Sequence, residues 1–335
     1  MSHQASSPKS EPDAFSEVTD EFTLVEKDEV ASYNDQSTMM GSGDPTINGP
    51  DTEVNPEIPE KASNLVSERQ DSEDDNDEDT GETQGLDDNM DLLADYPDDT
   101  EELELIHSRL SSCSALNLPR FAQHLKRLCL RQNLISTLEP SDFESLEEIE
   151  ELDFYDNKIK HLGHALDKMH KLKVLDLSFN LIKAVPDSLG SFPSIDTLYF
   201  VQNKISVIEH FDQVCSTLRT LELGGNRIRT IENLDALTNL RELWLGKNKI
   251  TELRNLGHLK SLKILSVQSN RITKIEALEG LEELEELYLS HNGIKKLEGL
   301  DKNLKLRTVD LGNNRIDVLE NLSHLINLEE LWVSD

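Results

Sequence analysis

One eleven-residue phrase, L-x-x-L-x-L-x-x-N-x-I, recurs ten times from Leu125 to the end of the chain. Its clearest copy runs from Leu240 to Ile250 (L-R-E-L-W-L-G-K-N-K-I). The step from one asparagine to the next is 24 at first, then 23 three times and 22 four times. Self-similarity at such a fixed period is typical of solenoids, in which each copy forms one turn of a stack. The asparagines are Asn133, Asn157, Asn180, Asn203, Asn226, Asn248, Asn270, Asn292 and Asn314.

The phrase is the leucine-rich-repeat signature, and it predicts an α/β solenoid of about ten repeats of 22–24 residues. Each copy opens with a short strand, whose alternation points Leu243 and Leu245 into the core and Trp244 outward. The strands should form a concave parallel β-sheet, and each asparagine should hydrogen-bond backbone groups of neighbouring turns. The connectors space their apolar residues three apart, which favours short 3₁₀ or α turns on the convex side of a horseshoe.

Charge divides the chain of 335 residues into two parts. Residues 1–100 carry 29 acidic and 4 basic side chains, and residues 71–79 hold seven acids in nine positions. Such a segment has too little apolar surface to offset its ordering entropy, so we expect 1–100 to be disordered. Residues 101–124 are apolar without the repeat spacing and predict an N-terminal cap, with residues 125–335 as the solenoid. The expected cap residues are Leu103, Leu105, Ile106, Leu110, Leu116 and Leu118.

Several classes of function find no support in the sequence. There is no phosphate-binding glycine loop, no H-E-x-x-H and no nucleophile elbow, so we expect no enzyme and no cofactor. His161 and His164 lack a matching set of metal ligands, and we expect no metal site. No apolar run is long enough to span a membrane, and the net charge of −33 argues against nucleic acid as a partner. The N-terminus lacks a signal peptide, and three distant cysteines predict free thiols in a soluble intracellular protein.

The informative residues are those that point outward from the strands. Their middle column, the x of L-x-L, collects both tryptophans and two of the five tyrosines of the protein. It reads Cys129, Asp153, Asp176, Tyr199, Glu222, Trp244, Ser266, Tyr288, Asp310 and Trp332. The three outward columns together hold eight acids and two bases in 30 positions. Exposed aromatics are typical of binding hot spots, although aromatics also suit strands in general. We therefore predict a binding strip of roughly 43 Å (nine steps of about 4.8 Å) for a partner with a basic face.

Residues beyond the repeat consensus carry a resemblance to a known family. Phrases such as L-C-L-R-Q-N-L-I (128–135), Y-D-N-K-I (155–159) and L-Y-L-S-H-N-G-I (287–294) resemble the leucine-rich-repeat regulatory subunits of type-1 protein phosphatase, the protein phosphatase 1 regulatory subunit 7 family. The resemblance covers about residues 105–335. It implies a non-catalytic subunit whose concave face binds the phosphatase catalytic subunit and modulates its activity, maturation or location. It also allows a further phosphatase inhibitor in a ternary complex, and it implies a nuclear and cytoplasmic protein with a role in mitosis.

The resemblance implies particular binding residues. Asp176, Glu222, Asp310, Glu330 and Trp332 keep the residue types of the family. Tyr199 and Trp244 stand where the family has phenylalanine. With two more residues of the middle column, the predicted partner-binding set is Asp153, Asp176, Tyr199, Glu222, Trp244, Tyr288, Asp310, Glu330 and Trp332.

The end of the sequence departs from the family that it resembles. The family continues through another repeat into a C-terminal cap, whereas this sequence ends one residue before its tenth repeat asparagine. We therefore expect a C-terminal truncation and a last repeat without a covering neighbour.

The alternative function is that of an acidic leucine-rich-repeat protein of the nucleus that binds histones or acts as a chaperone. The N-terminal position of the acidic region and the length of the solenoid count against it.

Overall fold

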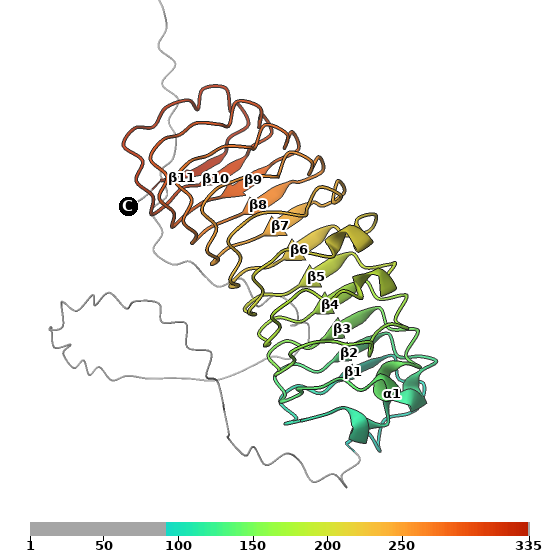
Figure 1. Ribbon diagram of the computed structural model, residues 1–335. Coiled ribbons are helices and arrows are strands. Elements are labelled where there is room, and N and C mark those ends of the chain that lie inside the picture. The colour runs from blue at the N-terminus through green and yellow to red at the C-terminus, as the bar shows by residue number, and fades with distance from the viewer. Residues whose placement is uncertain (1–91, 334–335) are drawn as a thin grey trace, which may run out of the picture. The chain divides into compact units, whose positions relative to one another are not determined.

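The computed structural model describes residues 92–333, which form a continuous stack of parallel strands (Figure 1). Eleven strands lie in sequence order in one sheet. This confirms the predicted leucine-rich-repeat solenoid. The strands are β1 (Glu102–Glu104), β2 (Arg127–Cys129), β3 (Glu151–Asp153), β4 (Val174–Asp176), β5 (Thr197–Tyr199), β6 (Thr220–Glu222), β7 (Glu242–Trp244), β8 (Ile264–Ser266), β9 (Glu286–Tyr288), β10 (Thr308–Asp310) and β11 (Glu330–Trp332).

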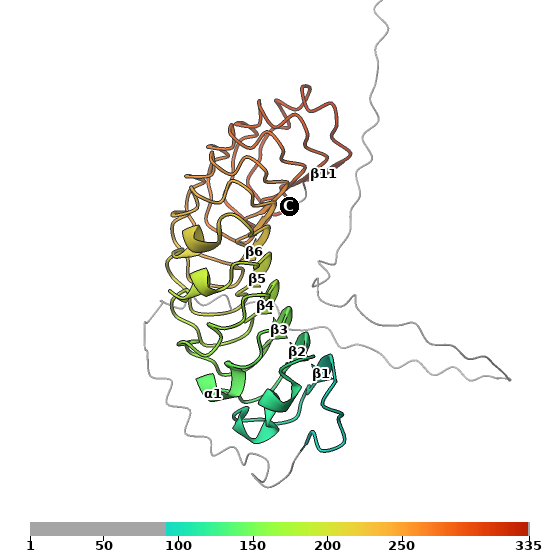
Figure 2. The same cartoon turned by 90° about the vertical axis from the view of Figure 1, so that its right-hand side faces the viewer.

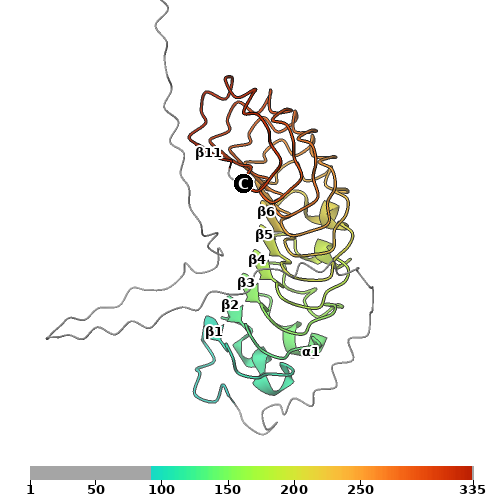
Figure 3. The same ribbon diagram turned by 90° about the vertical axis from the view of Figure 1, so that its left-hand side faces the viewer.

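The sheet occupies the inner side of the curved stack, and the connectors occupy the outer side (Figures 2 and 3). Each strand points its central residue into the hydrophobic core. Because side chains alternate along a strand, its two flanking residues lie on the concave surface of the sheet. The central leucines, such as Leu221 and Leu243, are fully buried. They join the apolar connector residues in one core cluster that runs from Leu93 to Leu325. The solenoid is therefore held together by apolar surface shared between neighbouring repeats.

The repeat asparagines link consecutive turns, as the sequence predicts. Asn226 is typical: its Nδ2 donates to the carbonyls of Phe200 at 2.8 Å, Leu223 at 3.0 Å and Gly224 at 3.3 Å. Its Oδ1 accepts the backbone N–H of Ile205 from the preceding repeat at 3.0 Å. Similar contacts recur at all nine asparagines, from Asn133 to Asn314. Backbone groups that the short strands leave unpaired inside the stack are satisfied in this way.

The connectors contain few regular helices. The described ones are the 3₁₀ segments η1 (Ser114–Leu116), η2 (Leu118–Phe121), η3 (Leu189–Ser191) and η4 (Phe211–Val214), and the α-helix α1 (Pro140–Phe143). After β6 the shorter repeats keep single turns instead. In one of them Leu237 N–H donates to Leu234 O and Leu240 N–H donates to Leu237 O, both at 3.0 Å. The predicted spacing of three thus gives turns of 3₁₀ type, which are too short to extend into helices.

The N-terminal cap differs from the prediction in one respect. Residues 102–104 form strand β1 and pair in parallel with β2, so the cap itself adds a strand to the sheet. Leu103 and Leu105 therefore point into the core, whereas Ile106 lies on the outward side and is 43% exposed. Ile106 thus belongs to the cap but does not pack into its core. The other expected cap residues (Leu110, Leu116 and Leu118) are buried.

The boundary between the acidic region and the cap also lies earlier than residue 100. Leu93 is fully buried in the core cluster, and the Arg120 guanidinium donates to the carbonyls of Leu93 and Tyr96. Residues 92–100 therefore belong to the folded part. The disorder predicted for the remainder, residues 1–91, lies outside the described residues.

Candidate functional site

Strand register brings the predicted binding residues into one line. Each middle-column residue is the pairing partner of the next, so that Tyr199 pairs with Glu222 and Glu222 pairs with Trp244. Eight of the nine predicted residues lie in this column; Glu330 lies in the column before it, where it pairs with Thr308. The structure extends the column at its start with Glu104, which pairs with Cys129. We call the inner surface formed by the outward residues of all strands the concave strip.

The three aspartates of the column have a local structural role. Asp153, Asp176 and Asp310 each accept a hydrogen bond from the backbone N–H two residues further on, at 2.8–3.0 Å. Such bonds hold the chain where it leaves the strand. Asp153 also forms an ion pair with Arg131 Nε at 3.2 Å. These carboxylates are therefore partly engaged within the chain, although Asp153 and Asp176 keep some exposed surface.

Glu222 has no such partner. Among the described residues, no hydrogen bond or ion pair involves its half-buried carboxylate. Burial, with Asp176 and Glu242 nearby, raises the pKa of Glu222 to about 7. Burial and the neighbouring Asp153 raise the pKa of Asp176 to about 6. A cation from a partner would relieve this unfavourable ionisation, because a nearby opposite charge favours the charged form. Glu222 is thus the carboxylate of the column best suited to bind a partner cation.

Two aromatic rings stack across a strand whose residue in the middle column is small. Trp244 on β7 and Tyr288 on β9 have ring centroids 6.1 Å apart and an interplanar angle of 20°. Ser266 lies between them on β8 and is 1% exposed. The Trp244 Nε1–H donates to Glu242 at 3.4 Å, and the Tyr288 hydroxyl donates to Glu286 at 2.7 Å. The rings are therefore oriented before any partner arrives, which lowers the entropic cost of binding.

A second aromatic group was not predicted from the sequence. The rings of Tyr155 and Phe179 lie 4.8 Å apart, and the Arg131 guanidinium lies 4.4 Å from the centre of the Tyr155 ring. Phe179 directly precedes a repeat asparagine and has φ of 55°, so it stands outside the three strand columns. Its exposed fraction of 39% extends the aromatic surface beyond the sheet. An aromatic at a position where other repeats have polar residues or glycine was the available signal.

Charge on the concave strip is one-sided. The only basic side chains in its three columns, among the described residues, are Arg127 on β2 and Arg131 just after it. Arg127 forms an ion pair with Glu151 at 3.5 Å, and Arg131 forms one with Asp153. From β4 to β11 the strip carries acids and no described base. The strip therefore favours a partner that presents lysine or arginine to it.

Residues 92–333 offer neither a metal site nor a membrane span. They contain no group of three or more histidine, cysteine or carboxylate side chains that could hold a metal ion. No helix in residues 92–333 is long and apolar enough to cross a membrane. Cys113, Cys129 and Cys215 are free thiols, and burial raises the pKa of Cys113.

Comparison with known proteins places this geometry in a class. Family models described as leucine-rich repeats match residues 123–182 and 201–306. A solved leucine-rich-repeat protein of Leptospira interrogans is 28% identical, with a TM-score of 0.54 over 64% of this chain and 62% of that one. Residues 92–333 therefore have the leucine-rich-repeat fold.

Within that class the chain is similar to named phosphatase subunits. It is 49% identical over 94 residues to protein phosphatase 1 regulatory subunit SDS22 of Saccharomyces cerevisiae. These 94 residues are 28% of this chain and 28% of that protein. It is 46% identical over 94 residues to the subunit of the same name from Schizosaccharomyces pombe, covering 28% of this chain and 26% of that protein. Both relatives are named as regulatory subunits and not as catalytic ones.

The raised pKa of Glu222 predicts a pH-dependent effect of its replacement. Because the folded-state pKa is above the usual 4.5, folding favours the protonated carboxyl, and this stabilisation is lost as pH rises through about 7. At pH 8 the free energy of unfolding of Glu222→Gln should therefore exceed that of the parent by about 3 kcal/mol, because each pKa unit corresponds to about 1.36 kcal/mol. At pH 4.5 the two proteins should be nearly equal. Urea denaturation at both pH values measures the difference.

The matched control is Glu104→Gln, which removes an exposed glutamate from the same column. Its effect should be small at both pH values. Equal free energies for Glu222→Gln and the parent at pH 8 would show that the carboxylate is well solvated in the folded protein.

Proposed function

We propose that this protein is a non-catalytic regulatory subunit that binds the catalytic subunit of type-1 protein phosphatase on its concave strip. The observation that carries the proposal is the strip itself, where the unpartnered Glu222 lies beside the preoriented Trp244 on a surface without bases from β4 onward. The similarity to two proteins named as protein phosphatase 1 regulatory subunits supports this choice of partner. Their matched segments cover less than a third of each chain, so the partner and the regulatory role rest on this proposal.

The arrangement supports binding by a folded partner. The half-buried carboxylate of Glu222 lies between two aromatic side chains, Tyr199 and Trp244, and the three offer charge and ring faces to one incoming lysine or arginine. The aspartates on either side fix the backbone and add negative potential. The strip would act on the phosphatase through the surface that it covers. The nuclear and cytoplasmic location, the mitotic role and the ternary complex with a further inhibitor remain predictions.

Charge reversal at Glu222 tests the proposal. Glu222→Lys should weaken binding of the purified phosphatase catalytic subunit by at least tenfold, because it places a cation where the partner's cation would bind. Isothermal titration calorimetry with the full chain measures the dissociation constant. The control is Glu279→Lys, an exposed position in the connector before β9 with the same charge change. Equal affinities for the parent and Glu222→Lys would contradict binding on the concave strip.

Titration of the same variants with core histones distinguishes the proposed function from the histone-binding alternative. A histone-binding protein would bind core histones through its general negative charge, so both lysine variants would lose affinity to a similar small extent. We expect tight, Glu222-dependent binding of the phosphatase and weak, salt-sensitive binding of histones. The reverse order of affinities would favour the histone-binding alternative.

A further inference from the structure

Lysine and arginine gather along one edge of the sheet. We call the residues that directly follow the repeat asparagines the asparagine edge. Six of these nine positions are basic and none is acidic. They are Leu134, Lys158, Leu181, Lys204, Arg227, Lys249, Arg271, Gly293 and Arg315. The cations are therefore concentrated at one position of the repeat in a chain whose net charge is strongly negative.

A backbone ladder fixes these residues in a single column. The N–H groups of Arg227, Lys249 and Arg271 each donate to the carbonyl of an isoleucine in the preceding repeat, at 2.8 Å. The same bond recurs from Lys158 to Arg315. Seven steps of about 4.8 Å, the strand spacing, place the cations along a line of roughly 34 Å. The line is rigid because its spacing is set by the backbone, whereas the long side chains remain adjustable.

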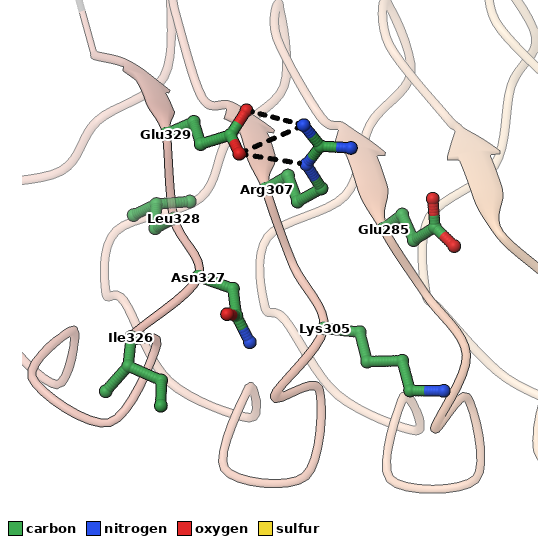
Figure 4. A pocket seen from close by; sticks show the side chains of 7 residues that line it. All are labelled: Glu285, Lys305, Arg307, Ile326, Asn327, Leu328 and Glu329. Carbon is green, nitrogen blue, oxygen red and sulfur yellow. Dashed lines mark hydrogen bonds and ion pairs between the residues drawn. The ribbon is translucent and has the colours of Figure 1, made fainter.

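At the opposite edge of the sheet, where the strands begin, most cations are paired with carboxylates. There, lysines and arginines that precede the strands form ion pairs between repeats, as in Lys173–Glu150 at 2.7 Å and Lys126–Glu101 at 2.8 Å. Figure 4 shows the same edge at the last repeats, where Arg307 pairs with Glu329 at 2.9 Å. The hollow drawn there is lined by these paired charges and by Ile326, Asn327 and Leu328. The cations of that edge are already largely neutralised.

On the asparagine edge the central cations are not neutralised. Within residues 92–333, no ion pair involves Arg227, Lys249 or Arg271. Arg227 and Arg271 are exposed, and Lys249 is half-buried. The position two residues after the asparagine edge carries an exposed cation in four repeats, and these four cations form a second row. The only acid at this position in the described repeats is Asp317, near the end of the stack. These four are Lys160, Lys183, Arg229 and Lys295.

We propose that the asparagine edge binds an extended acidic segment of a partner polypeptide. A single-file row of cations fits a thin chain whose carboxylates repeat on one side every two residues, about 6.7 Å apart. The proposal goes beyond the concave strip, because that strip is acidic and takes a basic partner. One protein could then hold a basic face and an acidic segment on adjacent surfaces.

Other polyanions fit less well. A duplex or a lipid surface is broad and would approach the carboxylates of the concave strip within about one screening length of 8–10 Å. A single-stranded nucleic acid needs aromatic side chains on which its bases stack. In the described repeats from Asn226 onward, the residues from each repeat asparagine to the fifth position after it include no phenylalanine, tyrosine or tryptophan. This part of the row, with Arg227, Lys249 and Arg271, therefore lacks a stacking platform for bases.

Charge reversal on the full chain tests the proposal. The probe is a fluorescent decapeptide of alternating glutamate and glycine, which is about 33 Å long when extended. The parent should bind it saturably, and the dissociation constant should rise with salt. The variant R227E/K249E/R271E should weaken binding at least tenfold. The control R241E/K260E/K302E makes the same charge change at exposed positions away from the asparagine edge and should bind like the parent.

Each outcome has a defined meaning. Equal losses in the two variants would overturn the proposal, because net charge alone would then explain binding. Absence of saturable binding by the parent would overturn it as well, as would tighter binding of a ten-nucleotide oligothymidylate or of phosphatidylserine vesicles at the same salt. Circular dichroism melting of both variants confirms folding, since the replaced side chains are on the surface. Phosphatase binding by the concave strip should survive in R227E/K249E/R271E, which separates this proposal from the one above.

Discussion

Replacing Trp244 and Tyr288 together by alanine should weaken binding of the phosphatase catalytic subunit by at least a hundredfold. The two rings stack at 6.1 Å over the buried Ser266, and their polar atoms are held by Glu242 and Glu286. Truncation of one such aromatic at a binding centre typically costs about 2 kcal/mol or more. Because a tenfold change in affinity corresponds to about 1.4 kcal/mol, two such truncations give a loss of two to three orders of magnitude.

Single variants sharpen this experiment. Because the rings contact one another, Trp244→Ala and Tyr288→Ala should not be additive, and a double-mutant cycle should show coupling. Titration calorimetry gives the three dissociation constants. Tyr96→Ala serves as the control, since Tyr96 is 39% exposed and lies before the first strand, away from the sheet. If the double variant binds as tightly as the parent, the phosphatase does not use the concave strip.

Replacing Asn226 by alanine should lower the free energy of unfolding by about 3 kcal/mol, because an unsatisfied buried polar group costs about 1–3 kcal/mol. The variant leaves the N–H of Ile205 and the carbonyl of Phe200 without their partner inside the stack. The lost amide makes four hydrogen bonds in all. Because each repeat is stable only against its neighbours, the loss should also broaden the unfolding transition. Urea denaturation followed by circular dichroism measures both effects.

An asparagine elsewhere in the same repeat provides the control. Asn239 is exposed, and its side chain makes a single hydrogen bond of 3.5 Å to the Ser216 carbonyl. Asn239→Ala should therefore change the free energy of unfolding by less than about 0.5 kcal/mol, as is usual for surface substitutions. Similar losses in the two variants would mean that the amide of Asn226 does not tie the repeats together.

The sequence correctly predicted which outward residues are neighbours on the sheet, because the repeat contains one strand per turn. When every turn is built alike, residues at equal positions of the phrase become neighbours, so Glu222 and Trp244 are adjacent even though they belong to successive repeats. Strand β1 escaped prediction because its repeat lacks the asparagine and departs from the later period, although Leu103 pairs with Leu128 in the same register as the other strands. Without that strand, the sequence could not show that Leu103 and Leu105 of the cap are buried while Ile106 is exposed.

The phrase with Leu243, Leu245 and Asn248 determined the solenoid, its core and the column in which each outward residue stands, since these follow from period and alternation. Only the tertiary structure decided how the members of a column differ. It showed that Asp176 and Asp310 bond to their own backbone while Glu222 does not, and that Trp244 stacks on a ring two strands away. Desolvation, ring contact and ion pairing depend on the side chains that surround a group in space. A repeating sequence sets the positions of those neighbours but leaves their contacts to the packed structure.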